Sequence, residues 1–223
     1  MINWVPFTVS LSLAIWTTVI LVVVCFPLAW VFARSKCRWI PFVESFLSLP
    51  LVLPPTVLGF YLLISLSPFS PVGAFLKSTF GLTLVFSFPG IVAASCVSAL
   101  PFMLGALRTG ISSVPENLLE ASWTLGKSKL ETILRIVLPN MKTALLTGII
   151  TTFAHTLGEF GVVLMIGGSI PGATKTVSIA IFERVEAQDL SSAHAYAIAL
   201  VVISYAGTYA LNRLQRAGNR RNG

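Results

Sequence analysis

The sequence predicts an all-α, polytopic membrane protein with about five transmembrane helices. Hydrophobic residues make up 55% of the 223-residue chain and charged residues only 10%, with a mean hydropathy of +0.87. This composition is far more apolar than that of soluble domains. Several apolar stretches are long enough to cross the bilayer core as helices. Lys and Arg gather in alternate loops between these stretches. We therefore expect a single transmembrane domain over residues 1–223.

The first two expected spans cover about residues 9–33 and 42–66. The first has no basic region before it, and its apolar stretch exceeds the roughly 7–15 residues of a signal-peptide core, so it is expected to stay as an anchor. Three prolines in the second, Pro50, Pro54 and Pro55, must break or kink a helix. Lipid tolerates such a break only where neighbouring protein satisfies the freed carbonyls. An inward-facing functional break and a simple packing kink are equally open.

The remaining expected spans cover about residues 84–107, 143–166 and 193–214. The first of these carries many small residues, which allow close approach between helices. The loop 167–192 contains an apolar piece, Val177–Phe182, that is too short to cross the membrane. We expect this piece to form a short re-entrant or surface helix.

Lys and Arg are distributed unequally between the two sides of the expected bundle. Twelve fall on one side, namely Arg34, Lys36, Arg38, Arg108, Lys127, Lys129, Arg135, Lys142, Arg213, Arg216, Arg220 and Arg221, and three fall on the other, namely Lys77, Lys175 and Arg184. Because basic loops stay in the cytoplasm, the N-terminus is expected outside and the C-terminus inside. The net charge of +7 is explained by this topology, and no aromatic-interleaved basic patch indicates a nucleic-acid partner.

The polar segment 113–139 lies between the third and fourth spans, on the expected cytoplasmic side. Ser113 stands three residues before Glu116, and Ser128 stands three residues before Glu131. This spacing is typical of capping boxes, in which a Ser accepts from a first-turn N–H and a Glu reaches back to the cap. The segment therefore predicts two short helices.

Glycine and proline mark where these two helices begin and end. Pro115 suits a first turn, Gly126 can take the left-handed conformation that ends the first helix, and Pro139 is expected to stop the second. The first helix carries a weakly apolar face made by Leu118, Leu119, Ser122 and Leu125. Such a face suits docking into a partner's groove. On the pattern alone, an ordinary cytoplasmic loop is an equal alternative.

A longer motif within this segment favours the docking interpretation. Glu120-Ala121-Ser122, then Gly126 after three residues and Ile136-Val137-Leu138-Pro139 after nine more, resembles the EAA signature of permease subunits of bacterial ABC importers. Ser122 departs from the family's Ala by a small-for-small change. The resemblance implies a MetI-like permease fold whose coupling helix pair sits in a cleft of a separate ATPase subunit. It assigns the coupling role to Glu120, Ala121, Ser122, Gly126 and Pro139.

The fourth span holds an unusual set of polar residues, namely Thr151, Thr152, His155, Thr156 and Glu159. Ionisable groups within a span are costly, so we interpret this set as pathway or gate candidates. His155 and Glu159 are four residues apart, so they share a helix face and can pair. In the alternative, backbone N–H groups near Gly158 and Gly161 satisfy Glu159, with His155 as its structural partner. Since a carboxylate would repel an anion, Glu159 suits a gate or brace, and the hydroxyls suit a pathway lining.

Catalytic and metal-binding motifs are missing from the sequence. Gly126-Lys127-Ser128 imitates the end of a P-loop, but Ala121 stands where that motif needs Gly. HExxH, CxxC and GxSxG are absent, as is any cluster of Asp, Glu and His at metal spacing. We expect no enzymatic activity, no cofactor and three reduced cysteines.

Two further stretches, residues 49–63 and 156–182, resemble the permeases of molybdate and tungstate importers, and sulfate and thiosulfate permeases are similar but less close. Within the second stretch, Gly158-Glu159-Phe160-Gly161 and Ile170-Pro171-Gly172 match the family's outer-end pattern. The resemblance implies a homodimer in the cytoplasmic (inner) membrane, two ATPase subunits, and a periplasmic or extracytoplasmic binding protein that delivers the oxyanion.

The expected function is ATP-driven import of molybdate or tungstate by alternating access. A sulfate or thiosulfate permease would differ only in its cargo. A secondary transporter would need an internal inverted repeat, which is not visible. An intramembrane enzyme or scaffold would leave the coupling motif with nothing to couple.

Overall fold

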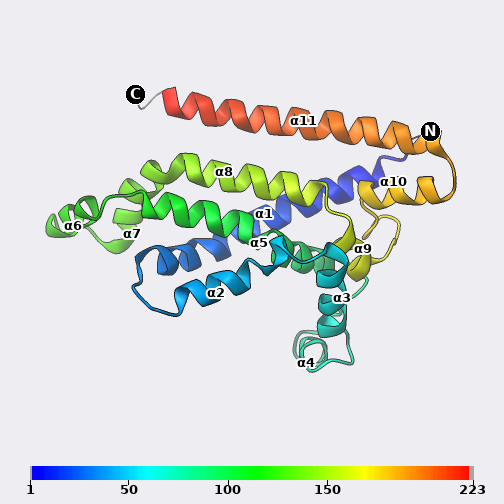
Figure 1. Cartoon of the computed structure of the whole chain (residues 1–223), viewed down its shortest axis with the longest axis horizontal. Coiled ribbons are helices and arrows are strands. Elements are labelled where there is room, and N and C mark those ends of the chain that lie inside the picture. Colours follow the sequence, from blue (N-terminus) through cyan, green and yellow to red (C-terminus); the bar gives the residue numbers. More distant parts are fainter. Residues whose placement is uncertain (1, 221–223) are drawn as a thin grey trace.

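The computed structural model describes residues 2–220, except for the side chains of residues 211, 212 and 214–220; Arg221, counted above, lies outside this range. Within it the chain forms helices and no strand (Figure 1). The long helices are α1 (Val5–Arg34), α5 (Phe88–Ser112), α8 (Leu138–Leu157) and α11 (Leu190–Arg220). The shorter ones are α2 (Ile40–Leu47), η1 (Leu49–Leu51), α3 (Pro55–Leu66), α4 (Pro71–Phe80), α6 (Glu116–Thr124), α7 (Lys129–Thr132), η2 (Ile133–Val137), α9 (Gly161–Gly167) and α10 (Val177–Glu186).

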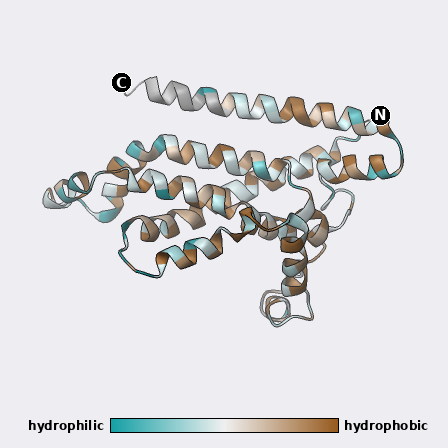
Figure 2. Ribbon diagram, in the orientation of Figure 1, coloured by the Kyte–Doolittle hydropathy of each residue, from teal (hydrophilic) through white to brown (hydrophobic). Residues whose placement is uncertain are grey.

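Four helical segments are long and apolar enough to cross a membrane: Val5–Arg34, Phe88–Ser112, Lys129–Leu157 and Leu190–Ala210. A fifth crossing is possible if the pair Ile40–Leu51 and Pro55–Leu66, bent by 108°, is one broken span. The prediction of an all-α protein with about five spans is confirmed. Figure 2 shows brown, hydrophobic positions on every long helix, as expected for helices that face both lipid and one another.

The centre of the bundle is α5, which packs against both α1 and α8. Small residues bring α5 and α8 close together, as predicted for the third span. A Cβ on Gly110 of α5 would lie 2.6 Å from the Cβ of Ala144, and one on Gly148 of α8 would lie 3.1 Å from the Cβ of Ala106. Since real Cβ atoms rarely approach so closely, both contacts depend on glycine.

The prolines of the second span break it as predicted. The helical segment ends at Leu51, and Pro55 opens α3 at a position where a missing N–H costs nothing. Beyond the break, α3 packs against α9. Gly161 of α9 lies so close to α3 that a Cβ there would be 2.9 Å from the Cβ of Pro55. The break therefore serves a tight helix contact, while its functional role stays a prediction.

The fourth span ends earlier than the expected residue 166. Helix α8 stops at Leu157, residues 158–160 leave the helix, and α9 is a separate short helix. The apolar run in the sequence continues through this break, which is why hydropathy alone joined the two helices. The apolar piece at Val177–Phe182 forms part of α10, a short helix that does not qualify as a span, as expected.

The expected stop at Pro139 is wrong. Helix α7 continues through η2, a π-helical turn, directly into α8. Leu138 N–H bonds to the Ile133 carbonyl, and Pro139 falls in the first turn of α8. The wider π turn lets the chain accommodate a proline that has no N–H to donate. One continuous helical rod therefore joins α7 to the α8 span.

The capping box predicted at Ser113 is also absent. The N-cap of α6 is Pro115, and the Ser113 hydroxyl donates to the Gly110 carbonyl of α5, 2.8 Å away. The Ser113 side chain therefore bonds to the last turn of α5 and does not cap α6. In Figure 1, α6 and α7 lie at one end of the elongated molecule, while α9, α10 and the N-terminus lie at the other.

Candidate functional site

Helices α6 and α7 form a hairpin whose turn is set by Gly126. The Gly126 N–H bonds to the Trp123 carbonyl at 2.9 Å, and the Lys127 N–H bonds to the Ser122 carbonyl at 3.1 Å. These two bonds define a Schellman motif, which needs a left-handed residue after the C-cap. Gly126 has φ = 75°, and a Cβ there would meet no neighbour within 4 Å. The prediction for Gly126 is confirmed. A larger residue is disfavoured at this position by the left-handed backbone conformation and not by a clash with a neighbour.

The start of α7 is capped as predicted by Ser128, whose Oγ accepts from the Glu131 N–H at 3.2 Å. The Glu131 carboxylate does not reach back to the cap. It lies 2.9 Å from Lys127 Nζ and 3.3 Å from an Arg135 guanidinium nitrogen. This half of the capping box is replaced by an ion-pair network that ties the turn to η2.

A buried hydrogen bond holds the two helices together. The Ser122 and Thr132 hydroxyl oxygens lie 2.8 Å apart, and both residues are buried. Thr132 also donates to the Ser128 carbonyl at 3.0 Å. The departure from Ala at position 122 therefore has a partner, which the sequence pattern missed because Thr132 lies on another helix.

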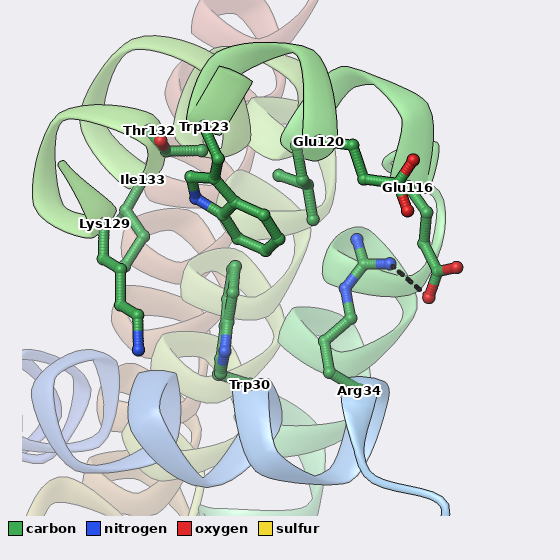
Figure 3. A pocket seen from close by; sticks show the side chains of 9 residues that line it. Trp30, Arg34, Glu116, Glu120, Trp123, Lys129, Thr132 and Ile133 are labelled. Atoms are coloured by element: carbon green, nitrogen blue, oxygen red, sulfur yellow. Dashed lines mark ion pairs between the residues drawn. The ribbon is translucent and has the colours of Figure 1, made fainter. Parts of the chain in front are cut away.

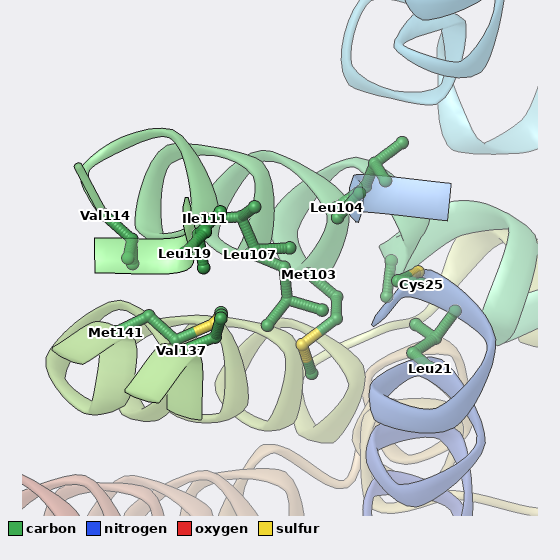
Figure 4. Close-up of a cluster of buried hydrophobic side chains, with 12 residues drawn as sticks. Leu21, Cys25, Met103, Leu104, Leu107, Ile111, Val114, Leu119, Val137 and Met141 are labelled. Carbon is green, nitrogen blue, oxygen red and sulfur yellow. The ribbon is translucent and has the colours of Figure 1, made fainter. Parts of the chain in front are cut away.

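The inner face of the hairpin joins the main core. Leu119 is 3% exposed and packs in one cluster with Ile111 of α5 and with Val137 and Met141 around η2 and α8 (Figure 4). The cluster continues to Cys25 of α1. This cluster therefore connects α6 to all three central helices.

The outer face of the hairpin carries a docking patch, which we define as exposed large apolar side chains on α6, α7 and the turns beside them. Its members, with their exposed fractions, are Leu118 (40%), Leu125 (77%), Leu130 (66%) and Leu134 (54%). Glu120 and Ala121 are exposed on the same helix. Of the face predicted for α6, Leu119 and Ser122 point inward, and Leu118 and Leu125 point outward.

Arg34 ties the end of α1 to the elbow between α5 and α6. One guanidinium nitrogen donates to the carbonyls of Ile111 and Val114, at 3.0 and 2.8 Å. Another lies 3.8 Å from a Glu116 carboxylate oxygen. A cation at this point also complements the negative end of the α5 dipole. Sequence reasoning counted Arg34 only as a topological signal, because a contact with residues 77 or more positions away leaves no local pattern.

A hollow of about 380 Å³ lies between α1 and the hairpin (Figure 3). Trp30 of α1 and Trp123 of α6 point toward each other across it. The full lining comprises Trp30, Arg34, Glu116, Leu119, Glu120, Trp123, Lys129, Thr132 and Ile133. This hollow therefore contains the coupling candidate Glu120 and both partners of the Arg34–Glu116 ion pair.

The polar residues predicted for the pathway do not share one environment. Thr152 and Thr156 are buried, and neither hydroxyl has a hydrogen-bond partner. Thr151 is exposed, and its hydroxyl donates to the Thr147 carbonyl of its own helix at 2.9 Å. Two of the three hydroxyls thus face the bundle interior, and the third faces outward.

The predicted pair between His155 and Glu159 does not form. His155 Nε2 lies 3.2 Å from Ser98 Oγ of α5, and its ring lies 4.5 Å from that of Phe102, centre to centre. Because α8 ends at Leu157, Glu159 no longer follows the helical spacing that would bring it beside His155. The expectation was wrong because it assumed an unbroken helix.

Glu159 is 7% exposed, yet neither carboxylate oxygen has a hydrogen-bond partner of normal geometry. Ser95 and Ser98 of α5 are its polar neighbours. The alternative in which backbone N–H groups satisfy this carboxylate is therefore also wrong. A buried, unpaired carboxylate is expensive, and sites of this kind often serve function.

Among residues 2–220 no group of three or more His, Cys, Asp and Glu side chains could hold a metal ion. The three cysteines are free; Cys25 is buried and Cys37 is exposed. Together, the bundle of candidate spans and the hairpin at one end define a polytopic helical membrane protein.

The chain belongs to the family of binding-protein-dependent transport system inner membrane components, whose family model matches residues 2–222. It is 44% identical over 208 residues to the molybdenum transport system permease protein ModB of Azotobacter vinelandii, covering 93% of this chain and 92% of that protein. It is 31% identical over 192 residues to the sulfate transport system permease protein CysT of a Synechocystis strain, covering 86% and 67% of the two chains.

A solved structure of the MetNI methionine ABC transporter, in an inward-facing conformation, shares the fold. The TM-score is 0.69 at 17% sequence identity, and the match covers 96% of this chain and 93% of that chain. The predicted permease fold is therefore confirmed, and the protein is a multi-pass transport permease of the inner membrane.

Proposed function

We propose that the chain is the permease subunit of an ATP-driven importer that moves molybdate or tungstate into the cell. Two copies would form the pathway, two ATPase subunits would bind at the cytoplasmic side, and an extracytoplasmic binding protein would deliver the oxyanion. The observation that carries this proposal is the α6–α7 hairpin, which exposes an apolar docking patch outside the spans and anchors its other face in the core.

The docking patch supports binding to a separate ATPase. Helix α6 lies outside the four helical segments able to cross a membrane, and apolar side chains exposed there are expected to be covered by another protein. Glu120 and Ala121 lie exposed on the same helix, and the turn at Gly126 fixes the angle at which α6 is presented. We propose that these residues engage the ATPase cleft, while Ser122 braces the hairpin from inside.

The continuous helix from α7 to α8 supports a mechanical link to the spans. Closure of two ATPase subunits would displace the hairpin, and the rod through η2, together with the Leu119 cluster, would pass this displacement to α8, α5 and α1. Pro139 lies within this continuous helix and would be displaced with it. In alternating access, such movement exposes the pathway to one side of the membrane and then to the other.

The arrangement of the ends supports the proposed orientation. The last turns of α11 lie at the same end of the molecule as α6 and α7, and the N-terminus lies at the opposite end (Figure 1). With the basic loops in the cytoplasm, the C-terminus and the hairpin would share the cytoplasmic side. ATP hydrolysis would then occur in the partner subunits and not in this chain.

The proposed cargo follows from the relatives. The molybdenum permease is 44% identical and the sulfate permease 31%. Buried hydroxyls of Thr152 and Thr156, with His155 and Glu159 nearby as gate candidates, would line or control the pathway, and weak binding there would let the ion leave. Thr151 faces away from the bundle interior, so it would contribute only where a second copy covers it.

Uptake of labelled molybdate by reconstituted vesicles that contain the permease, the ATPase and the binding protein tests this function. We expect ATP-dependent uptake that excess tungstate suppresses and equal sulfate does not. Stronger competition by sulfate would assign the chain to sulfate transport, and uptake without ATP hydrolysis would indicate a secondary transporter.

A further inference from the structure

We propose that Arg108 of α5 binds the transported oxyanion where the ion leaves the pathway, in exchange for the ion pair of Arg108 with Glu44 of α2. This inference rests on the proposed function, because it takes the cargo to be a tetrahedral oxyanion and the hairpin end of the bundle to be cytoplasmic. Neither residue belongs to the coupling motif or to the polar set of the fourth span.

Arg108 is a charged residue within a helix that is long and apolar enough to cross the membrane. It precedes the last residue of α5, Ser112, by about 6 Å along the helix axis. Its side chain is 46% exposed. A half-exposed guanidinium is costly against lipid, and charged groups within spans usually face a water-filled path. Arg108 therefore marks a position that an anion in such a path would reach.

The helix face beside Arg108 leads to the gate candidate His155. Four residues of α5 lie on this face, spaced by four, three and four positions, namely Ser98, Phe102, Gly105 and Thr109. His155 Nε2 lies 3.2 Å from Ser98 Oγ, and the His155 ring lies 4.5 Å from that of Phe102, centre to centre. Arg108 follows Phe102 by about 9 Å toward the cytoplasmic end. An ion that passes His155 would therefore reach Arg108 next.

The surface beside Arg108 has room for a bound ion. Gly105 precedes Arg108 by one helical turn and is exposed. A Cβ at Gly105 would meet no neighbour within 4 Å, so this space is open. Thr109 is also exposed, and its hydroxyl donates to the Gly105 carbonyl at 2.9 Å. A tetrahedral ion can therefore approach the guanidinium without displacing a large side chain of α5.

Glu44 gives Arg108 a partner that an oxyanion can replace. A Glu44 carboxylate oxygen lies 2.8 Å from an Arg108 guanidinium nitrogen. Helix α2 packs chiefly against η1, with Leu47 against the main core, so Glu44 can rotate away without unpacking α5. An oxyanion with two negative charges offers two acceptor oxygens to the guanidinium fork and attracts it more strongly than one carboxylate does. Return of Glu44 would displace the ion, which keeps its retention short, as release requires.

Uptake by the reconstituted transporter is the first test. Arg108→Gln should lower the uptake rate about tenfold, the loss expected for a charge-assisted contact worth ~1.4 kcal/mol, and Arg108→Lys should restore part of it. Glu44→Gln breaks the same ion pair but leaves the cation in place, so it should retain uptake. Arg38→Gln removes an exposed cation from the same side of the membrane and is the matched control. Equal losses in Arg108→Gln and Glu44→Gln would mean that the pair only holds α2 to α5, and would overturn the inference.

Site-specific labelling gives a second test that does not depend on transport. Phenylglyoxal modifies accessible guanidinium groups, and peptide mass spectrometry would quantify each site in the assembled transporter. Molybdate should protect Arg108 but not Arg38, and Glu44→Gln should show this protection at a lower molybdate concentration because the competing carboxylate is gone.

The two tests separate this inference from the proposed function. Absence of protection by molybdate, protection by phosphatidylglycerol vesicles in its place, or normal uptake in Arg108→Gln would overturn the inference alone. The second of these results would assign the site to a lipid headgroup. An unmodified transporter in which molybdate protects Arg108 but which imports no oxyanion would instead refute the proposed function.

Discussion

Glu159 is the residue whose environment is hardest to explain by stability alone. Its side chain is buried beside Ser95 and Ser98, and neither of its carboxylate oxygens has a hydrogen-bond partner of normal geometry. Such a group destabilises the state in which it is buried without a partner. We propose that Glu159 acts in another conformation that opens this region, in line with a gate.

We expect Glu159→Gln to raise thermal stability and to lower oxyanion uptake. Replacing a buried carboxyl group by a neutral amide, which costs less to bury than a carboxylate, should stabilise the described state by about 1–3 kcal/mol, while the gate loses its ionisable group. Thermal unfolding in detergent and uptake in vesicles would measure the two effects. As a control, Glu186→Gln replaces an exposed glutamate outside the spans and should change neither value. Lower stability with normal uptake would instead indicate a simple brace.

Ser122 offers a test of hairpin stability at the same scale. Ser122→Ala removes the bond to Thr132, but Thr132 still donates to the Ser128 carbonyl. The cost should therefore stay near ~1 kcal/mol, and uptake should persist because Ala also fits this buried position. Thr132→Val should cost more, because it removes the bonds to both Ser122 and the Ser128 carbonyl. The double variant should cost less than the sum of the two single variants, as a double-mutant cycle in chemical unfolding would measure. Strictly additive costs would contradict the contact.

At the scale of elements, the hairpin turn can be tested by strain. Gly126→Val forces a branched residue into φ = 75°, which should disturb the Schellman turn without any clash. Gly81→Val is a matched control, because Gly81 ends α4 with φ = 65° and also has open space around it. We expect only the Gly126 variant to lose ATPase co-purification while both stay in the membrane. Glu120→Lys should have the same effect through charge.

Helix α10 contains a titratable contact outside the spans. Burial tends to raise the pKa of Glu183, but its hydrogen bonds with Lys175 and Ser169 and the nearby cations hold the pKa below the usual 4.5. Because the folded pKa is depressed, this contact stabilises the outer loop above pH 4.5 and is lost as the pH falls through the folded value. The hydrogen-exchange protection factors of residues 169–183, taken relative to the intrinsic rates at each pH, should fall on acidification below pH 4.5. Glu183→Gln should show low protection both above and below that pH.

The sequence predicted the elements better than their partners. Hydropathy located the long spans, and local chemistry predicted the breaks at Pro54 and Gly126, because these signals act within a few residues. The sequence-based prediction was wrong at Pro139, because a π turn lets the helix continue past the proline. It was also wrong at residues 158–160, because the apolar run continues past the end of α8. The contacts of Arg34 could not be predicted, because sequence periodicity indicates which face of a helix is buried but not which distant residues that face contacts.

For the whole molecule, the native cysteines offer a test of topology. Cys37 is exposed in the turn between α1 and α2, on the side of the hairpin, whereas Cys25 is buried. A membrane-impermeant maleimide should therefore label Cys37 in inside-out vesicles but not in intact cells. In a Cys37→Ser background, Thr79→Cys on exposed α4 should show the opposite pattern. Labelling of Cys37 from outside would place the docking patch away from ATP and refute the proposed coupling, because no cytoplasmic ATPase could then reach α6.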